Sequence, residues 1–163
     1  MIISLIHDYT IKISRRILMY SYKKRFQSAG SNVIFDILTS TFSFHSISLG
    51  DNVYIGPNAY FSSSHGKIKI SDNVMFGPGV KILGGNHKFS LDVPMFFQDK
   101  NDNDDDGTII IENDVWIGAN VIILPNVKIE QGCVVGAGSV VTKDLKKFSV
   151  YAGNPCKFIK ERS

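Results

Sequence analysis

The sequence predicts an all-β protein in which short parallel strands wind into a solenoid of stacked triangular coils. Three observations predict this fold class. A six-residue pattern repeats without interruption from Ile111 onward, the same pattern recurs in the first half of the chain, and three such units make one triangular coil of about 18 residues. The chain has 163 residues, which suits one domain and leaves little room for two.

The repeat is clearest in the second half of the chain. Read in steps of six from Ile111 to Lys146, the sequence is IENDVW, IGANVI, ILPNVK, IEQGCV, VGAGSV and VTKDLK, and every unit opens with Ile or Val. A helix repeats every 3.6 residues and a half-buried strand every two, so neither explains a period of six. The period indicates a solenoid, in which stacking of coils supplies the core that one coil cannot bury alone.

Four coils are recognisable in this frame, and a degenerate one precedes them around residues 31–48. A three-residue insertion, KIK, separates the first recognisable coil from the second. Strands on successive coils are expected to stack at about 4.8 Å, which pairs their backbone groups along the solenoid axis. The four coils span residues 49–66, 70–87, 111–128 and 129–146.

The remaining segments are expected to cover the ends of the solenoid and to interrupt it once. Residues 1–30 form an N-terminal helical cap, with an amphipathic helix over 3–26. Residues 31–148 form the coils, and an extruded loop over 88–110 leaves them between the second and third coils. Loops of this length are usually functional or mobile. Residues 149–163 form a tail whose segment 155–162 is expected to be a short helix.

Composition excludes several classes of protein. The chain is 44% hydrophobic and 20% charged, which is typical of a soluble globular protein. Its net charge of +3 is too small for nucleic-acid binding as a main function. Two cysteines make neither a disulfide framework nor a zinc ligand set, which favours a reducing, cytoplasmic setting. No stretch has the length of a membrane span, and the N-terminus lacks the pattern of a signal peptide.

Charge is unevenly distributed along the chain. Six basic and no acidic residues lie between Lys12 and Arg25, and five of the 15 acidic residues lie in 99–106. A basic amphipathic helix suits peripheral contact with an anionic membrane or a lipid-linked glycan. A cap on the first coil explains the apolar side of that helix equally well.

The segment IGANVIILPNVKIEQGCVVGAGSVVTKD, followed by YAGNPCKFIKE, resembles the hexapeptide-repeat acyltransferases. The likeness covers residues 31–162 and is greatest to the maltose, galactoside and polysaccharide O-acetyltransferases. It implies a left-handed parallel β-helix, a homotrimer, and transfer of acetyl from acetyl-CoA to a hydroxyl or amine in a ternary complex. The left hand comes from the resemblance alone, because parallel crossovers are otherwise right-handed.

The resemblance implies that His87 is the catalytic base, because it stands just before the extruded loop. A sugar hydroxyl is a poor nucleophile until a base takes its proton, and neutral imidazole can take it. A surface histidine at the start of a loop is the alternative. Lys88 follows His87 where the sugar O-acetyltransferases often have proline, which leaves the acceptor open.

Three further residues are candidates for the acceptor site. Trp116 ends its six-residue unit and should therefore point outward; the resemblance places it beside the reacting centre, and packing between subunits is the alternative. Asn86 and His65 are expected to line the acceptor pocket, although a locally satisfied His65 is an equal alternative. The stretch NAYFSSSH lacks the Asp that relatives often carry there.

The resemblance also implies the acetyl-CoA site. Backbone amides of Ala119 and Ala137 fall where the family contacts the thioester and the pantetheine arm. Cationic side chains are expected along the path of the cofactor's phosphates, although a solvated basic tail is the alternative. The candidates toward the nucleotide are Thr142, Lys143, Lys157 and Lys160.

We expect no bound metal. The segment DNDDDGTIIIEN, residues 102–113, resembles a calcium loop but has Asn at its closing position and leads into a strand, so a mobile acidic loop is the better interpretation. A zinc-binding or scaffold protein related to the γ-carbonic anhydrases would need a histidine triad, for which the coils offer His45, His65 and His87.

The favoured function is an acetyl-CoA-dependent O-acetyltransferase of a saccharide, in surface-polysaccharide biosynthesis. An N-acetyltransferase of an amino sugar is an alternative. Such relatives often carry an N-terminal nucleotide-sugar domain, for which residues 1–30 are too few. A catalytically inactive coil protein is a further alternative, and loss of CoA binding would identify it.

Overall fold

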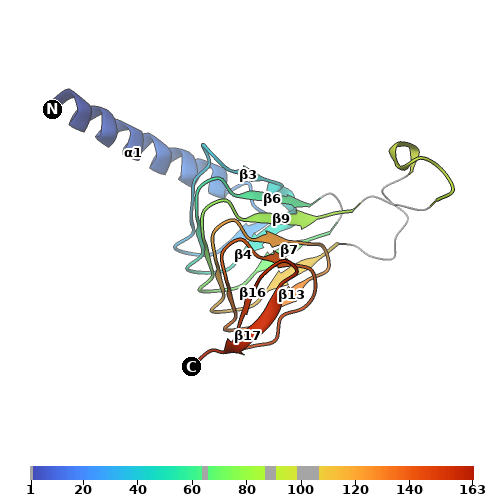
Figure 1. Cartoon of the computed structure of the whole chain (residues 1–163). Helices are drawn as coiled ribbons and strands as arrows, with labels where there is room; N and C mark the ends of the chain where they lie inside the picture. Colours follow the sequence, from blue (N-terminus) through green and yellow to red (C-terminus); the bar gives the residue numbers. More distant parts are fainter. Residues whose placement is uncertain (1, 64–65, 87–90, 99–106) are drawn as a thin grey trace.

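The computed structural model describes residues 2–63, 66–86, 91–98 and 107–163, with side chains described from Tyr9 onward. One long helix, α1 (Ile2–Lys23), is followed by short strands that form three sheets along the sides of a triangular prism (Figure 1). Within the coils every described strand pair is parallel, as the repeat predicts.

The strands of each coil belong in turn to the three sheets. Sheet A contains β1 (Ser28–Ala29), β4 (Ile47–Leu49), β7 (Ile68–Ile70), β10 (Ile109–Ile111) and β13 (Lys128–Ile129). Sheet B contains β2 (Ile34–Phe35), β5 (Tyr54–Ile55), β8 (Met75–Phe76), β11 (Trp116–Ile117), β14 (Val134–Val135), β16 (Ser149–Ala152) and β17 (Lys157–Glu161). Sheet C contains β3 (Thr41–Phe42), β6 (Tyr60–Ser63), β9 (Lys81–Gly84), β12 (Ile122–Ile123) and β15 (Val140–Val141).

Two of the three edges of the prism matter for the site. The B–C corner, where sheet B turns into sheet C, consists of residues 36–40, 56–59, 77–80, 118–121 and 136–139. The C–A corner, where sheet C turns into sheet A, consists of the described residues among 43–46, 64–67, 85–108, 124–127 and 142–144.

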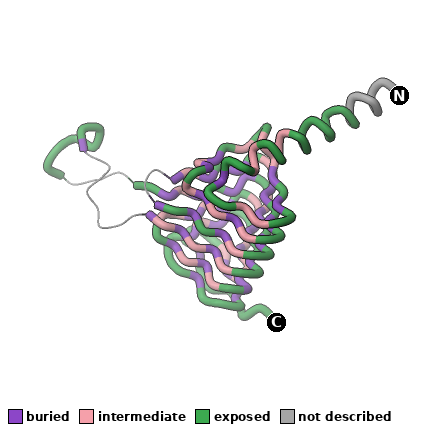
Figure 2. The backbone as a smooth tube through the Cα atoms, turned by 180° about the vertical axis from the view of Figure 1, so that it is seen from behind, coloured by how far each residue is buried: buried purple, intermediate pink, exposed green. Residues whose placement is uncertain are grey.

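The predicted repeat is confirmed by the pattern of burial. Buried and exposed residues alternate along each coil, and the buried ones stack from coil to coil (Figure 2). The opening residues of the predicted units are all buried: Leu49, Ile55, Phe61, Ile70, Phe76, Ile82, Ile111, Ile117, Ile123, Ile129, Val135 and Val141. These side chains form one continuous core, as stacking of coils requires.

Asparagines stabilise the turns between sheets A and B. Asn52 and Asn73 have φ values of 55° and 59°, a region that Asn adopts more readily than most residues. The side-chain amide of Asn32 donates to Asn52 at 2.9 Å, and that of Asn52 donates to Asn73 at 3.0 Å. The ladder holds the coils at 31–48, 49–66 and 70–87 in register.

The N-terminal end of the solenoid is closed mainly by aromatic rings. Phe26 lies against Phe35, Phe42 and Phe44, with ring centroids 4.8–5.6 Å apart. Most of α1 extends away from the coils, and among its described side chains only Met19 and Tyr22 pack against the core (Figure 1). The helix predicted here is present, and its last turns are the part that meets the first coil.

The prediction of a short helix over 155–162 is wrong. Residues Lys157–Glu161 form β17, which pairs antiparallel with β16. A helix of eight residues is marginal by itself, whereas the open edge of β16 offers unpaired backbone groups. Arg162 further stabilises the C-terminal segment. Its backbone N–H donates to Phe148 O at 2.7 Å, and its guanidinium pairs with Asp114 at 2.9 Å.

The extruded loop leaves and re-enters at the C–A corner. β9 ends at Gly84 and β10 begins at Ile109, and a Cβ on Gly107 would lie 3.0 Å from Gly84 O, so the two ends of the loop are close together. The described tip contains the 3-10 helix η2 (Met95–Phe97) and lies away from the coils (Figure 1). In the described part of the chain, no helix has the length and apolar character needed to cross a membrane.

Candidate functional site

The two histidines expected in the site, His87 and His65, lie outside the described residues. The structure does describe Asn86, which follows β9 by two residues and is exposed at the base of the extruded loop. Asn86 therefore belongs to the C–A corner of the prism.

Trp116 lies on a different side of the molecule. It occupies β11 in sheet B, points outward as its place in the repeat predicts, and is 53% exposed. Trp116 is in register with Met75, and Met75 with Tyr54. These residues belong to the outward row of sheet B, which consists of Ile34, Tyr54, Met75, Trp116, Val134 and Val150.

One copy of the chain does not bring Asn86 and Trp116 together. In a triangular prism the C–A corner lies opposite the face formed by sheet B, and Asn86 belongs to that corner whereas Trp116 belongs to that face. A site that uses both residues needs the corner of one copy and the face of another.

Ala119 and Ala137 are brought together at the B–C corner. They occupy the same place in successive coils, and the N–H of Gly138 donates to Ala119 O at 2.8 Å. Among the hydrogen bonds of the described residues, none uses the N–H of Ala119 or of Ala137 as donor. Two backbone donors are therefore available one above the other, about 4.8 Å apart given the spacing of stacked strands.

The preceding coils show that the fold does not need these two N–H groups. The equivalent place in the coils at 49–66 and 70–87 holds proline, in GPN at Pro57 and in GPG at Pro78. Proline has no N–H to donate. The amides of Ala119 and Ala137 therefore serve no hydrogen bond on which the solenoid depends, which leaves them for a ligand.

The four residues expected at the nucleotide end of acetyl-CoA lie in two separate parts of the structure. Lys157 and Lys160 lie on β17, where Lys157 is in register with Ala152 and Lys160 with Val150 at the end of the outward row. Thr142 and Lys143 are exposed at the C–A corner, on the far side of sheet C from Ala119. The ion pairs among the described residues involve none of these lysines.

The chain matches the family model "Bacterial transferase hexapeptide (six repeats)" over residues 108–143. The chain contains a bacterial hexapeptide-repeat transferase domain. A putative acetyltransferase of Staphylococcus aureus (strain COL) is 39% identical over 137 residues, which is 83% of this chain and 65% of the relative. The chain thus spans about two thirds of the length of the curated relatives that it matches most strongly.

Solved structures agree with the fold. A maltose O-acetyltransferase from Clostridium difficile 630 is 31% identical, with a TM-score of 0.68 over 83% of this chain and 66% of that one. A galactoside acetyltransferase in complex with coenzyme A is 28% identical, with a TM-score of 0.75 over 93% of this chain and 80% of that one. An N-acyltransferase from Bacillus cereus in complex with dTDP and coenzyme A is 26% identical, with a TM-score of 0.62 over 88% of this chain and 89% of that one. The solenoid matches the left-handed β-helix of these acetyltransferases.

The two cysteines of the chain are not candidate nucleophiles. Cys133 and Cys156 are free and buried. Burial raises the pKa of the Cys133 thiol to about 11 and also raises the pKa of the Cys156 thiol. A thiolate is the reactive form, so both side chains are unreactive near neutral pH.

The described residues contain no group of three His, Cys, Asp or Glu side chains placed to hold a metal ion. Of the histidine triad considered for zinc, only His45 is described, and it lies at the C–A corner of the first coil. The acidic part of the calcium-like segment, 102–106, also lies outside the described residues.

The resemblance named Ala119 and Ala137, but sequence reasoning missed that the fold leaves their N–H groups unpaired, and it missed a groove beside α1. The unpaired amides at the B–C corner leave one signal in the sequence, because proline and alanine exchange at the third place of the repeat. A groove between α1 and sheet B, lined in part by Arg15, Arg16 and Tyr54, leaves no such signal, because helix and strand meet only in the folded chain.

Proposed function

We propose that this chain is an acetyl-CoA-dependent O-acetyltransferase that transfers acetyl to a saccharide hydroxyl, in the biosynthesis of a surface polysaccharide. The observation that carries the proposal is the stacked pair of unpaired amides at Ala119 and Ala137. These are the positions that resemblance to the sugar O-acetyltransferases assigns to the donor, and the fold leaves their N–H groups unused.

The donor lies along the B–C corner in this proposal. The N–H of Ala137 donates to an amide carbonyl of the pantetheine arm, and the N–H of Ala119 donates to the thioester oxygen. Lys157 and Lys160 lie farther along sheet B, beyond the last parallel strand, where they meet the phosphates of the nucleotide end. The order of these groups along the prism follows the order of groups in acetyl-CoA.

The chemistry is direct transfer. His87 takes the proton of the acceptor hydroxyl as its oxygen attacks the thioester carbon. Negative charge develops on the former thioester oxygen, where a fixed N–H at Ala119 stabilises it. The carbon–sulfur bond then breaks, the proton held by His87 passes to the leaving sulfur, CoA departs as its thiol, and the saccharide carries the ester.

A homotrimer completes the site. The catalytic corner and Trp116 lie on opposite sides of one copy, so a neighbour has to supply one of them. The exposed side chains of Met75 and Trp116 in the middle of sheet B support this arrangement, because adjoining exposed apolar groups are typical of an interaction site. Three copies arranged around an axis give three equivalent clefts, each with His87 from one copy and Trp116 from the next.

Two substitutions test the chemistry. His87→Ala should retain acetyl-CoA binding and lower kcat by about 10²–10⁴-fold, the usual contribution of a general base. The wild-type rate should fall as the pH is lowered, because protonated imidazole accepts no proton. His65→Ala is the matched control and should mainly raise the KM for the acceptor.

If His87→Ala kept a near-normal kcat while His65→Ala abolished transfer, the base would be His65, one coil earlier. If neither substitution changed the rate, the scaffold alternative would replace the enzyme. Light scattering tests the assembly: a stable, fully active monomer would contradict a site shared between copies.

The similarity to the Bacillus cereus N-acyltransferase keeps an amino-sugar acceptor as a second candidate. Amines and hydroxyls need the same base and the same donor site. A panel of paired sugars that differ only in amino or hydroxyl at one carbon, with mass spectrometry of the products, separates the two.

A further inference from the structure

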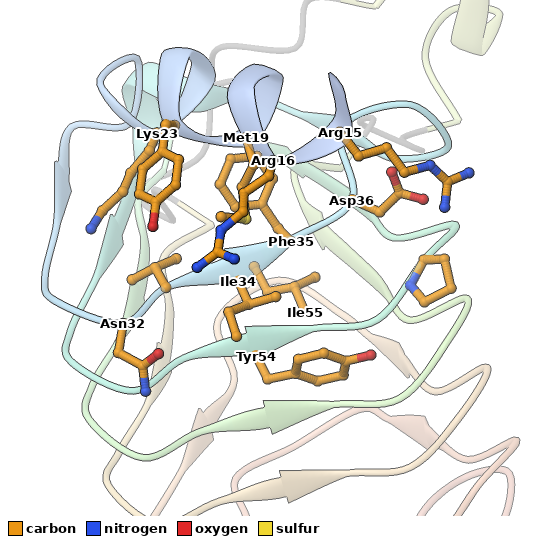
Figure 3. Close-up of a pocket in the computed structure, with 13 residues that line it drawn as sticks. Arg15, Arg16, Met19, Lys23, Asn32, Ile34, Phe35, Asp36, Tyr54 and Ile55 are labelled. Atoms are coloured by element: carbon orange, nitrogen blue, oxygen red, sulfur yellow. The ribbon is translucent and has the colours of Figure 1, made fainter. Parts of the chain in front are cut away.

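A groove with a cavity volume of about 610 Å³ lies between α1 and the first two strands of sheet B (Figure 3). Arg15, Arg16, Met19 and Lys23 of the helix form its upper wall, and the floor includes Tyr54 of β5. This volume is within the range of small-molecule sites. None of the residues assigned to acetyl-CoA belongs to the groove.

The upper wall is positively charged and largely uncompensated. The ion pairs among the described residues involve neither Arg15 nor Arg16, and both side chains are exposed. The Arg16 guanidinium points from the helix toward Ile34 of the floor (Figure 3). A nearby arginine, Arg25, is engaged differently: its guanidinium lies over the rings of Tyr22 and Phe44, 5.1 and 4.9 Å from their centroids.

The lining of the groove also carries one negative charge, Asp36, which lies beside Arg15 (Figure 3). Asp36, the acidic residue among the lining side chains, accepts hydrogen bonds from the N–H of Leu38 at 3.1 Å and the hydroxyl of Thr39 at 3.0 Å. Asp51 lies outside the lining; its pKa is lowered first by the backbone N–H of Ser31 and, more weakly, by the charge of Lys23. Three cations of the lining, Arg15, Arg16 and Lys23, thus face one carboxylate, which leaves the groove positively charged overall.

The floor of the groove is apolar and continues toward Trp116. Ile34 and Tyr54 are each 45% exposed and are in register, and the same outward row continues through Met75 to Trp116. Two strand spacings separate Tyr54 from Trp116, which is about 10 Å. A ligand held in the groove can therefore extend over Met75 to the expected acceptor position.

We propose that this groove binds a phosphoryl or diphosphoryl group that carries the acceptor saccharide and is joined to an apolar or aromatic group. The inference rests on the proposed function, because it assigns the saccharide to the end of the row near Trp116. Arg15 and Arg16 supply planar forks of N–H donors that match phosphate oxygens. Ile34 and Tyr54 supply the apolar surface. The carrier is a nucleotide or a lipid, since both combine these two chemistries.

Binding is measured first without acetyl-CoA, so that it does not depend on catalysis. The probes are uridine diphosphate in solution and vesicles of phosphatidylcholine that contain phosphatidic acid. The test variant is Arg15→Ala with Arg16→Ala. The matched control is Lys12→Ala with Lys24→Ala, which removes the same charge from exposed positions outside the lining.

The test variant should weaken binding of at least one probe by about tenfold or more, since charge-assisted hydrogen bonds to phosphate are lost. The control should bind like the wild type. Uridine diphosphate as the affected probe identifies a nucleotide carrier, and the vesicles identify a lipid carrier. Equal losses in both variants, or no binding of either probe, would overturn the proposal.

Acetyl transfer is then compared between a free sugar and the same sugar linked to uridine diphosphate. Preference for the linked sugar, lost in the test variant and kept in the control, supports the groove as the carrier site. Transfer to the free sugar alone, unchanged in the test variant, would overturn the groove while the proposed function stands. Probe binding without any acetyl transfer would overturn the proposed function, and with it the assignment of the bound group as an acceptor carrier.

Discussion

Replacing Ala137 or Ala119 with proline should remove a ligand contact without disturbing the fold. The chain already tolerates proline at this place of the repeat, because Pro57 and Pro78 occupy it in earlier coils and follow glycine, as Ala119 and Ala137 do. No hydrogen bond of the described residues uses either alanine N–H, so proline breaks none. A proline compatible with the local backbone stabilises by about 0.4–1 kcal/mol through the unfolded chain.

The functional cost follows from one hydrogen bond. A neutral hydrogen bond contributes about 0.5–1.5 kcal/mol, which corresponds to about two- to tenfold in affinity. Ala137→Pro should therefore raise the KM for acetyl-CoA by that factor with kcat nearly unchanged. Ala119→Pro should lower kcat more strongly, by about 10²–10³-fold, if its N–H stabilises the developing oxyanion.

Steady-state kinetics and urea unfolding, at matched protein concentration, measure the two effects separately. Ala137→Ser keeps the N–H and should behave like the wild type. Proline variants that are as stable as the wild type and keep its kcat and KM would refute the assignment of the amides to the donor. Proline variants that fail to fold would refute the claim that the solenoid does not need these N–H groups.

Three further predictions concern charge and packing. Lys157→Ala and Lys160→Ala should each raise the KM for acetyl-CoA by at least about tenfold if the lysine contacts a phosphate, with unchanged unfolding by urea; an unchanged KM in both would indicate a solvated tail. Gly118→Ala should destabilise by about 1–3 kcal/mol in urea unfolding, because its Cβ would lie 2.6 Å from the backbone N of Ala137 in the next coil; near-neutral stability would contradict the close stacking. The pKa of Glu112 is lowered from 4.5, chiefly by the hydrogen bond from Lys128, so its contribution to stability is present above pH 4.5 and is lost as the pH falls through the lowered pKa. Glu112→Gln should reduce this acid sensitivity, and an unchanged pH profile of unfolding would rule the contribution out.

The repeat was predictable because it depends on local geometry. A residue's place in its six-residue unit decides whether its side chain faces the core or the solvent, and Ile117 and Trp116 follow this rule one position apart. The interruption at 88–110 was also predictable, since the frame stops and resumes there. The tail was not: a short segment such as Lys157–Glu161 takes its conformation from the edge of β16, which exists only after the coils have stacked.

The candidate site, too, was predictable from the sequence only in part. The sequence by itself determined the solenoid, its inward and outward rows, and the identity of the candidate residues. Only the tertiary structure decided that Ala119 and Ala137 lie above one another, that Trp116 and the base of the loop lie on opposite sides of the prism, and that Arg15 and Arg16 line one groove with Tyr54. The physical reason is that a repeat specifies the position of each residue within its own coil, whereas contacts between a corner, a face and a helix depend on how separate parts of the chain stack.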